Sequence, residues 1–574
     1  MNMIQFELDE LLPVLSDLIR LTKKQLLKLT QSLKELNKSD KVNEVRLFIT
    51  LFILLKNRFE VNFLVSVEVN KQALVFRLGK NMHSKLCNGL LVCLIIFVDL
   101  SSADSHNILQ EALRVKDKLH LHLFSESTHL FERKKILRYS EHLNKLGVNV
   151  KANGDLGEPL MLSPYIENGK LEEGRRKAAV PPFSGQVKSY AGFITVNKTF
   201  QSNLFFWFFE SESKDTESPL LVWLQGGPGA SSMFAVFTEN GPYVVDVGKQ
   251  KVSLRKTYWS QHFNVIYIDN PVGTGFSFAT ENGYAQNQTV VGRDLYNFML
   301  QFLTLFPHLR QNKFYITGES YAGKYIPAFA HTIHEQNQQT NDILKINLQG
   351  LFIGNGWSDP VNMLKYDNYL YELGLIDSNA KVEFANAQRS AVQLIEEEKW
   401  EEAAEAMDRI VGGDQSLFTK HTGLTNYYNY YNQKSGDFND TFFNSRLFRK
   451  SVHVGNLTFS EGGLVYEKLK ADVSKSVIDW IVQLLKNYPI VFYNGQLDII
   501  CAYPLTENVL KSMQWDMSDE YKKARRQVYK VNNQVAGYYK QVGNLTEFLI
   551  RDAGHMVPSD QPEWALQLLI DFTH

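Results

Sequence analysis

A serine set between small residues, directly after a short apolar run, constrains the fold of this chain more than any other feature. Residues 314–316 (Phe-Tyr-Ile) are apolar, and residues 318–323 read Gly-Glu-Ser-Tyr-Ala-Gly. This pattern predicts a strand that breaks at Gly318 and a helix that starts at Tyr321, because only small residues fit around such a tight turn. The turn lifts the Ser320 hydroxyl off the backbone and points the first helical N–H groups toward its reaction partner.

A serine in such a turn becomes a nucleophile only with a base and an acid. Asp498 follows the apolar run 488–493, and His555 follows the run 548–550, so both are expected in loops just after strands. The order Ser320, Asp498, His555 is that of the α/β-hydrolases and differs from the orders of the chymotrypsin and subtilisin types. We therefore predict an α/β protein with the α/β-hydrolase fold, in which helices flank a central mixed sheet.

A glycine-rich loop supplies the remaining part of such a site. The apolar run 220–224 predicts a strand, and residues 225–229 (Gln-Gly-Gly-Pro-Gly) follow it. Backbone N–H groups in this loop can point at the oxyanion of a tetrahedral intermediate. We assign the oxyanion hole to the N–H groups of Gly227 and Tyr321. One donor of this kind is typically worth about 3–4 kcal/mol in the transition state.

Four motifs together make the chain resemble a known family. They are Trp-Leu-Gln-Gly-Gly-Pro-Gly (223–229), Asp-Asn-Pro-Val-Gly-Thr-Gly-Phe-Ser (269–277), Gly-Glu-Ser-Tyr-Ala-Gly-Lys-Tyr (318–325) and Ala-Gly-His-Met-Val-Pro (553–558). The chain from about residue 160 to 574 resembles the serine carboxypeptidase family. Its motifs are most similar to those of the vitellogenic-like branch. The resemblance implies a serine-type carboxypeptidase that acts on peptides or proteins with a free C-terminal carboxylate. It implies no metal and no cofactor.

The resemblance also implies a binding site for the terminal carboxylate of the substrate. Its members would be Gln225, Gly226, Glu239 and Glu319, with Gln225 in a position where the family usually has Asn. Carboxyl groups that face a substrate carboxylate cannot all be ionised, so at least one glutamate must carry a proton. Activity should therefore be favoured at acidic pH. The plainer alternatives are a solvated loop acid at Glu239, a helix-capping role for Glu319 and a simple turn residue at Gln225.

The N-terminal part of the chain predicts export. Residues 82–103 have a basic start, an apolar core too short to span a bilayer and small residues before a cleavage point after Ala103, as in a signal peptide. Because signal peptides begin chains, we interpret residues 1–81 as a doubtful extension and expect translation to start at Met82. An internal signal anchor is the alternative, and Asp99 within the apolar segment argues against it.

The remaining chain divides into an arm and one large domain. Residues 104–155 are charged and are interpreted as a pro-segment or loose arm. Residues 156–574 should form the α/β-hydrolase domain, interrupted at about 360–485 by a mainly helical insertion that caps the active site. No stable membrane span is expected, and a homodimer is compatible with the sequence.

Export is consistent with the sequons and the cysteines. Five asparagines lie in glycosylation sequons: Asn197, Asn287, Asn439, Asn456 and Asn544. Removal of the signal peptide would also remove Cys87 and Cys93 and leave Cys501 as a single thiol, whereas relatives commonly carry disulfides. Cys501 is either a buried inert thiol or part of the wall of the substrate pocket. The secretory pathway is the predicted location, with the protein secreted or lysosomal.

Two other classes of function stay open at this point. One keeps the fold and changes the reaction, as in an acyltransferase or esterase in which an alcohol replaces water. The other is a non-catalytic secreted protein that stores or binds. The net charge of −1 and the absence of lysine and arginine runs interleaved with aromatic residues give no indication of nucleic-acid binding.

Overall fold

The computed structural model describes residues 63–69, 72–78 and 156–573, apart from residues 247–250, 340–344, 414 and 434–439. The chain divides into two compact units, Met1–His129 and Leu130–His574. In the first unit, strands β1 (Phe63–Val69) and β2 (Gln72–Leu78) pair antiparallel. The predicted signal peptide and the predicted arm, residues 82–155, lie outside the described residues.

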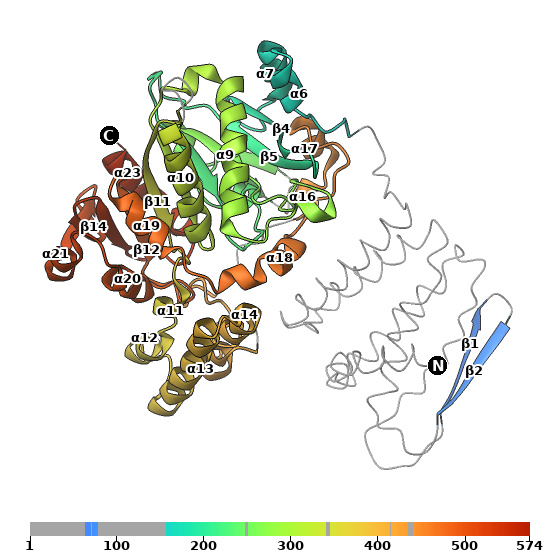
Figure 1. Ribbon diagram of the computed structural model, residues 1–574. Coiled ribbons are helices and arrows are strands. Elements are labelled where there is room, and N and C mark those ends of the chain that lie inside the picture. The colour runs from blue at the N-terminus through green and yellow to red at the C-terminus, as the bar shows by residue number, and fades with distance from the viewer. Residues whose placement is uncertain are drawn as a thin grey trace. The chain divides into compact units, whose positions relative to one another are not determined.

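The second unit is built on an eleven-stranded mixed sheet (Figure 1). In spatial order its strands are β13 (Gln527–Val531), β14 (Gln534–Val542), β15 (Leu545–Ile550), β12 (Ile490–Gly495), β11 (Leu348–Gly354), β10 (Phe314–Glu319), β6 (Leu220–Leu224), β9 (Asn264–Ile268), β5 (Ser202–Phe209), β4 (Ser189–Asn197) and β3 (Ala179–Val180). The strands from β15 to β9 pair in parallel, and those on either side of them pair antiparallel. A hairpin of β7 (Tyr243–Asp246) and β8 (Lys251–Leu254) forms a separate sheet.

Helices cover the sheet because its central strands are apolar on both faces. They are α6 (Ser163–Glu167), α7 (Leu171–Ala178), α8 (Met233–Thr238), α9 (Gln288–Leu305), α10 (Ala322–Gln339), α20 (Tyr503–Ser512), α21 (Ser518–Lys523), α22 (Val557–Asp560) and α23 (Pro562–Phe572). Short 3₁₀ turns lie at Trp259–Gln261, Glu281–Gly283 and Pro307–Leu309. Figure 1 shows α9 and α10 side by side across the sheet.

Strand β5 shows the two-sided burial most clearly, since all of its residues are buried. Successive side chains of a strand point to opposite faces. Phe206 and Phe208 accordingly join a core that includes side chains of α9 and α10. Phe205, Trp207 and Phe209 join a second core that includes side chains of α8 and α23. Two apolar layers therefore hold the sheet between them, which explains why the central strands read as continuous apolar runs.

A mainly helical insertion separates β11 from β12. Its helices are α11 (Pro360–Met363), α12 (Tyr366–Glu372), α13 (Ser378–Glu396), α14 (Trp400–Asp408), α15 (Leu417–Thr422), α16 (Asp440–Phe443), α17 (Arg446–Ser451), α18 (Gly463–Val473) and α19 (Ile478–Leu485). Figure 1 shows α12, α13 and α14 projecting away from the sheet. In the described part of the chain, no helix combines the length and the apolar character needed to cross a membrane.

Candidate active site

Ser320 occupies the turn between β10 and α10. The strand continues past the break that the sequence predicted at Gly318, because β11 still pairs with Glu319 through Gly354. The backbone turns at Ser320 itself, where φ is 62°, and α10 begins at Ala322 rather than at Tyr321. A non-glycine residue in the left-handed region costs about 1–3 kcal/mol and persists only where its surroundings enforce it. The Ser320 carbonyl accepts hydrogen bonds from the N–H groups of Gly323 and Trp357, each at 2.9 Å.

The glycine-rich loop after β6 lies directly against this turn. A Cβ on Gly226 would lie 2.5 Å from the Tyr321 nitrogen and 2.6 Å from the Ser320 Cβ, so no larger residue fits. Gly227 follows with φ of 109°. Since β6 and β10 are neighbouring parallel strands, the two segments to which we assigned the oxyanion hole end at the same edge of the sheet.

Strands β12 and β15 bring Asp498 and His555 together. The strands are parallel neighbours, so the loops that follow them meet at one edge of the sheet. His555 Nδ1 lies 2.8 Å from Asp498 Oδ2, and both side chains are buried. His555 Nε2 has no hydrogen-bond partner among the described residues. The structure therefore joins the predicted acid and base but shows no hydrogen bond between His555 and Ser320.

The tyrosine-rich segment 427–431 forms hydrogen bonds with the loop that follows Asp498 and with the loop that contains His555. The Tyr427 carbonyl accepts from the Ile499 nitrogen at 3.1 Å, and the Tyr428 carbonyl accepts from the His555 nitrogen at 2.7 Å. The rings of Tyr428 and His555 lie 5.2 Å apart between centroids. At least one of these tyrosines thus contacts the predicted base directly.

Asn355 is a residue of this site that the sequence analysis missed. Its Nδ2 donates to Asp498 Oδ2 at 2.6 Å, and its Oδ1 accepts from the Gly495 nitrogen at 3.3 Å. Asn355 directly follows β11 and has φ of 42°, a conformation that asparagine adopts more readily than most residues. The available signal was a polar residue between two glycines at the end of a strand next to the nucleophile strand.

The predicted carboxylate-binding residues form a buried polar group. Gln225 Nε2 donates to Glu319 Oε1 at 2.7 Å, and Gln225 Oε1 accepts from Trp223 Nε1 at 2.8 Å. Glu239 is 0% exposed and Glu319 is 1% exposed. Both oxygens of Glu239 and Oε2 of Glu319 lack a hydrogen-bond partner within the described chain. Glu239 is therefore not a solvated loop acid, and Gln225 is more than a turn residue.

Burial changes the acidity of both glutamates. Desolvation raises the pKa of Glu239 to about 7, although the nearby Glu319 and Gln225 side chains oppose this effect. Desolvation, together with the charge of Glu239, raises the pKa of Glu319 well above its ordinary value. Two carboxylates in one enclosed space repel each other, so the pair holds at least one proton at mildly acidic pH.

The remaining predicted residues are the five sequon asparagines and Cys501. Asn287 and Asn456 are exposed, and Asn197 is partly buried. Asn544 is also partly buried, and its Nδ2 donates to the Leu485 carbonyl at 2.8 Å. Asn439 lies outside the described residues, and glycosylation of all five sequons stays a prediction. Cys501 is buried, and burial, together with the charges of Asp498 and Glu319, raises the pKa of its thiol well above the ordinary value, which disfavours the reactive thiolate.

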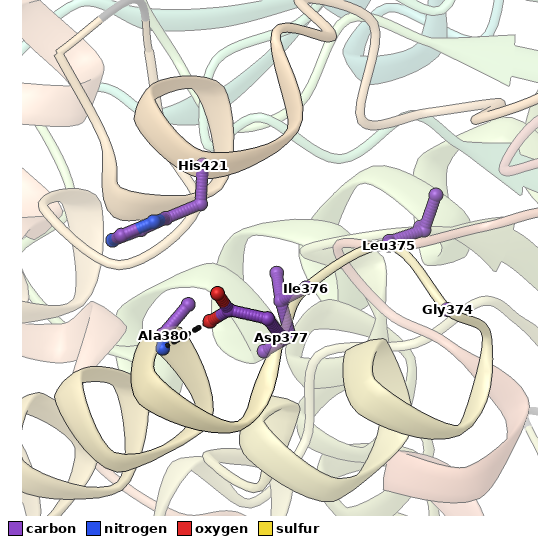
Figure 2. Close-up of a pocket in the computed structure, with 6 residues that line it drawn as sticks. All are labelled: Gly374, Leu375, Ile376, Asp377, Ala380 and His421. Atoms are coloured by element: carbon purple, nitrogen blue, oxygen red, sulfur yellow. Dashed lines mark hydrogen bonds between the residues drawn. The ribbon is translucent and has the colours of Figure 1, made fainter.

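A hollow on the helical insertion contains none of these residues (Figure 2). Its volume is about 310 Å³, and it is lined by Gly374, Leu375, Ile376, Asp377, Ala380 and His421. Figure 2 shows the Asp377 carboxylate directed at the Ala380 nitrogen, which lies 2.8 Å away. Asp377 therefore caps α13, and its position is explained without a ligand.

Comparison with known proteins identifies the class. The sequence model of the family described as serine carboxypeptidase matches residues 181–574. The chain belongs to the serine carboxypeptidase family, and it is a serine-type carboxypeptidase, a hydrolase that acts on peptides or proteins. A solved structure with this architecture is that of the prohormone-processing carboxypeptidase Kex1 from Saccharomyces cerevisiae. It aligns with a TM-score of 0.62 and 26% identity, over 70% of this chain and 96% of that one, which confirms the predicted fold.

Curated relatives support the predicted branch. The venom serine carboxypeptidase of Apis mellifera is 48% identical over 431 residues, which is 73% of this chain and 92% of that protein. The vitellogenic carboxypeptidase of Aedes aegypti is 46% identical, over 73% of this chain and 91% of that protein. The probable serine carboxypeptidase CPVL of Homo sapiens is 44% identical, over 74% and 92%.

Proposed function

We propose that this carboxypeptidase removes the C-terminal residue of its substrates through an acyl-enzyme formed on Ser320. The observation that carries the proposal is the buried 2.8 Å contact between His555 and Asp498, at the same sheet edge as the strained Ser320 turn. A base oriented by an acid, together with a serine at the same sheet edge, is the combination that activates a weak nucleophile.

The steps follow from these positions. Ser320 Oγ attacks the last peptide carbonyl while His555 Nε2 takes its proton. The N–H groups of Gly227 and Tyr321 stabilise the oxyanion. His555 then gives the proton to the leaving amino acid, and a water molecule, activated by the same imidazole, releases the shortened peptide and regenerates Ser320. Asp498 keeps the imidazole in the tautomer that this cycle needs.

The buried polar group explains why only the terminal residue would be removed. Gln225 and the Gly226 N–H can donate to the substrate's carboxylate, and a protonated Glu239 or Glu319 can donate a third hydrogen bond. Because burial raises the pKa of Glu239 to about 7, a proton on this residue is present at acidic pH and is lost as pH rises above that value, which leaves a carboxylate facing the carboxylate of the substrate. Activity should therefore be favoured at acidic pH.

We place the protein in the secretory pathway. The relative from Apis mellifera is named for venom, and residues 82–103 have the pattern of a signal peptide. N-terminal sequencing of exported protein, expressed from a gene for residues 1–574, should find a mature chain that starts after Ala103 or further on. A mature chain that still contains residues upstream of Met82 would contradict this assignment.

The first experiment measures release of the C-terminal amino acid from an N-blocked dipeptide at about pH 4.5 and about pH 7.5. The protein is expressed from Met82, and Ser320→Ala is assayed alongside. Release that is faster at the lower pH and abolished in Ser320→Ala is the expected result. Folded, processed protein that releases nothing at either pH would favour an acyltransferase or a non-catalytic role instead.

A further inference from the structure

A buried cluster of polar side chains joins the start of α10 to the end of α18. At its centre, Asp472 Oδ2 accepts hydrogen bonds from the Tyr321 hydroxyl at 2.6 Å and from Gln288 Nε2 at 2.7 Å. Lys324 Nζ lies 3.4 Å from the same oxygen and donates to the Asp472 backbone carbonyl. The proposed reaction uses the backbone N–H of Tyr321 but none of these four side chains.

The cluster is enclosed by protein. Lys324 is 0% exposed and Asp472 is 3% exposed. Burial lowers the pKa of Lys324 to about 8, with the charge of Asp472 opposing the shift. Moving two charges out of water costs several kcal/mol per ion, and a well-packed apolar pair is often as stable. The charged pair therefore calls for an explanation other than stability.

The position of Lys324 supplies that explanation. The last carbonyls of a helix lack partners within the helix, and a cation is favourable there. Besides the Asp472 carbonyl, Lys324 Nζ reaches the Val473 carbonyl at 3.5 Å, so it caps the C-terminal end of α18. The indole Nε1 of Trp357 donates to the same Val473 carbonyl at 3.0 Å, and the backbone N–H of Trp357 donates to the Ser320 carbonyl. Two routes thus connect the end of α18 to the Ser320 turn.

We propose that Lys324 and Asp472 are positioning residues that fix Tyr321, and with it the N–H group assigned to the oxyanion hole, a role that rests on the proposed function. Helix α18 belongs to the insertion between β11 and β12. Through Lys324 and Asp472, the geometry of the oxyanion hole therefore depends on the position of this insertion. A displacement of about 1 Å in a reacting group can lower a rate about 100-fold.

Tyr321→Phe is the mildest test, because it removes one hydroxyl and keeps the backbone N–H. We expect kcat for the N-blocked dipeptide to fall about tenfold with KM little changed, since the lost interaction acts in the transition state. Lys324→Met and Asp472→Asn should lower kcat at least as far. The double variant Tyr321→Phe/Asp472→Asn should be no slower than Asp472→Asn alone, because the hydroxyl acts through that carboxylate.

Two matched variants control for the loss of a buried polar contact elsewhere. Tyr315→Phe removes a hydroxyl that donates to the Thr573 carbonyl at 3.0 Å. Lys540→Met breaks a buried ion pair with Glu547, in which the charged atoms lie 3.0 Å apart. Both should lower the thermal-unfolding midpoint and leave kcat unchanged.

A wild-type kcat in Tyr321→Phe, or an effect confined to KM or to the unfolding midpoint, would overturn the inference. So would a loss of kcat in the control variants as large as that in Tyr321→Phe. Equal release by the wild-type protein and Ser320→Ala would overturn the proposed function and the inference with it. The two failures are therefore distinguishable in one set of assays.

Discussion

Glu239 and Glu319 show how an enclosed position changes the chemistry of a single residue. Only Gln225 donates a hydrogen bond to Glu319 among the described residues, and Glu239 has no such donor. An ionised carboxylate is unfavourable where it has few hydrogen-bond donors and no solvent. The pKa of both residues therefore rises, and the protonated form is favoured. In the proposed function, a proton held by either residue can be donated to the carboxylate of the substrate.

From the protonation of Glu239 we predict that activity declines at the high-pH side of the pH–rate profile. We expect kcat/KM for an N-blocked dipeptide to fall as pH rises through about 7, where Glu239 loses its proton. Glu239→Gln keeps a donor that does not titrate, so this limb should be absent or displaced in the variant. Full pH–rate profiles of both enzymes provide the measurement. Identical limbs would show that another group titrates.

We expect the Asn355 side chain to affect kcat through its hydrogen bond to Asp498. Asn355→Ala removes a 2.6 Å hydrogen bond to Asp498. Since a hydrogen bond to a charged group is worth about 1.5–3 kcal/mol, kcat should fall about 10- to 100-fold with little change in KM. Asn533→Ala is a matched control, because Asn533 also has a positive φ, 62°, but lies in an exposed turn between β13 and β14. Equal kcat values for Asn355→Ala and the wild type would refute the positioning role.

At the scale of elements, the parallel strands gather the site. Residues that follow β6, β10, β11, β12 and β15 lie far apart in the sequence, and parallel pairing brings the carboxyl ends of these strands to one edge of the sheet. In open sheets with parallel strands, this edge is where ligands bind. The helices on either face supply burial, and the loops at this edge supply the polar side chains.

The stability of these elements depends on the apolar residues of the central strands. Phe208 is fully buried, and its ring lies 5.2 Å from Phe302 and 5.1 Å from Phe306 between centroids. Phe208→Ala should lower the free energy of unfolding by about 3–5 kcal/mol, because it removes the ring and leaves a cavity. Val528→Ala on the exposed face of β13 should change it by less than about 0.5 kcal/mol. Denaturant titration would measure both, and similar losses would contradict the assigned burial.

Strands β6, β10, β12 and β15 were predictable from sequence because each contains an apolar run that ends at glycine or polar residues. Strands β13 and β14 were not predicted, because polar and apolar residues mix along them. The end of β10 was not predicted correctly, because pairing of Glu319 with Gly354 extends the strand beyond Gly318. Asn355 was missed because its partner Asp498 is 143 positions away. The burial of Glu239 was equally hidden, as a single acid after a short apolar helix has no pattern that distinguishes it from a surface residue.

At the scale of the whole molecule, the buried carboxyl pair affects how stability depends on pH. The pKa of Glu239 is about 7 in the folded protein against an ordinary value of 4.5. Between these values the folded state holds a proton that the unfolded chain has released. The free energy of unfolding should therefore fall with rising pH, and this one group contributes about 1.4 kcal/mol per pH unit.

Glu239→Gln tests this contribution, because the variant lacks the titrating group. Its free energy of unfolding should fall less steeply than that of the wild type between about pH 5 and about pH 7. Glu401→Gln on the exposed surface of α14 serves as control and should retain the wild-type slope. Parallel curves for Glu239→Gln and the wild type would show that the Glu239 proton is not held in the folded state.

The place of β15 in the sheet has a consequence for how the protein is made. This strand follows every other strand in the chain, yet it lies between β12 and β14 in the sheet. Until the ribosome has delivered it, β12 presents an unpaired edge to other nascent chains, and His555 is still missing. Closure of the sheet and arrival of the proposed base thus coincide, so we expect a half-synthesised chain to have no peptidase activity toward the polypeptides around it.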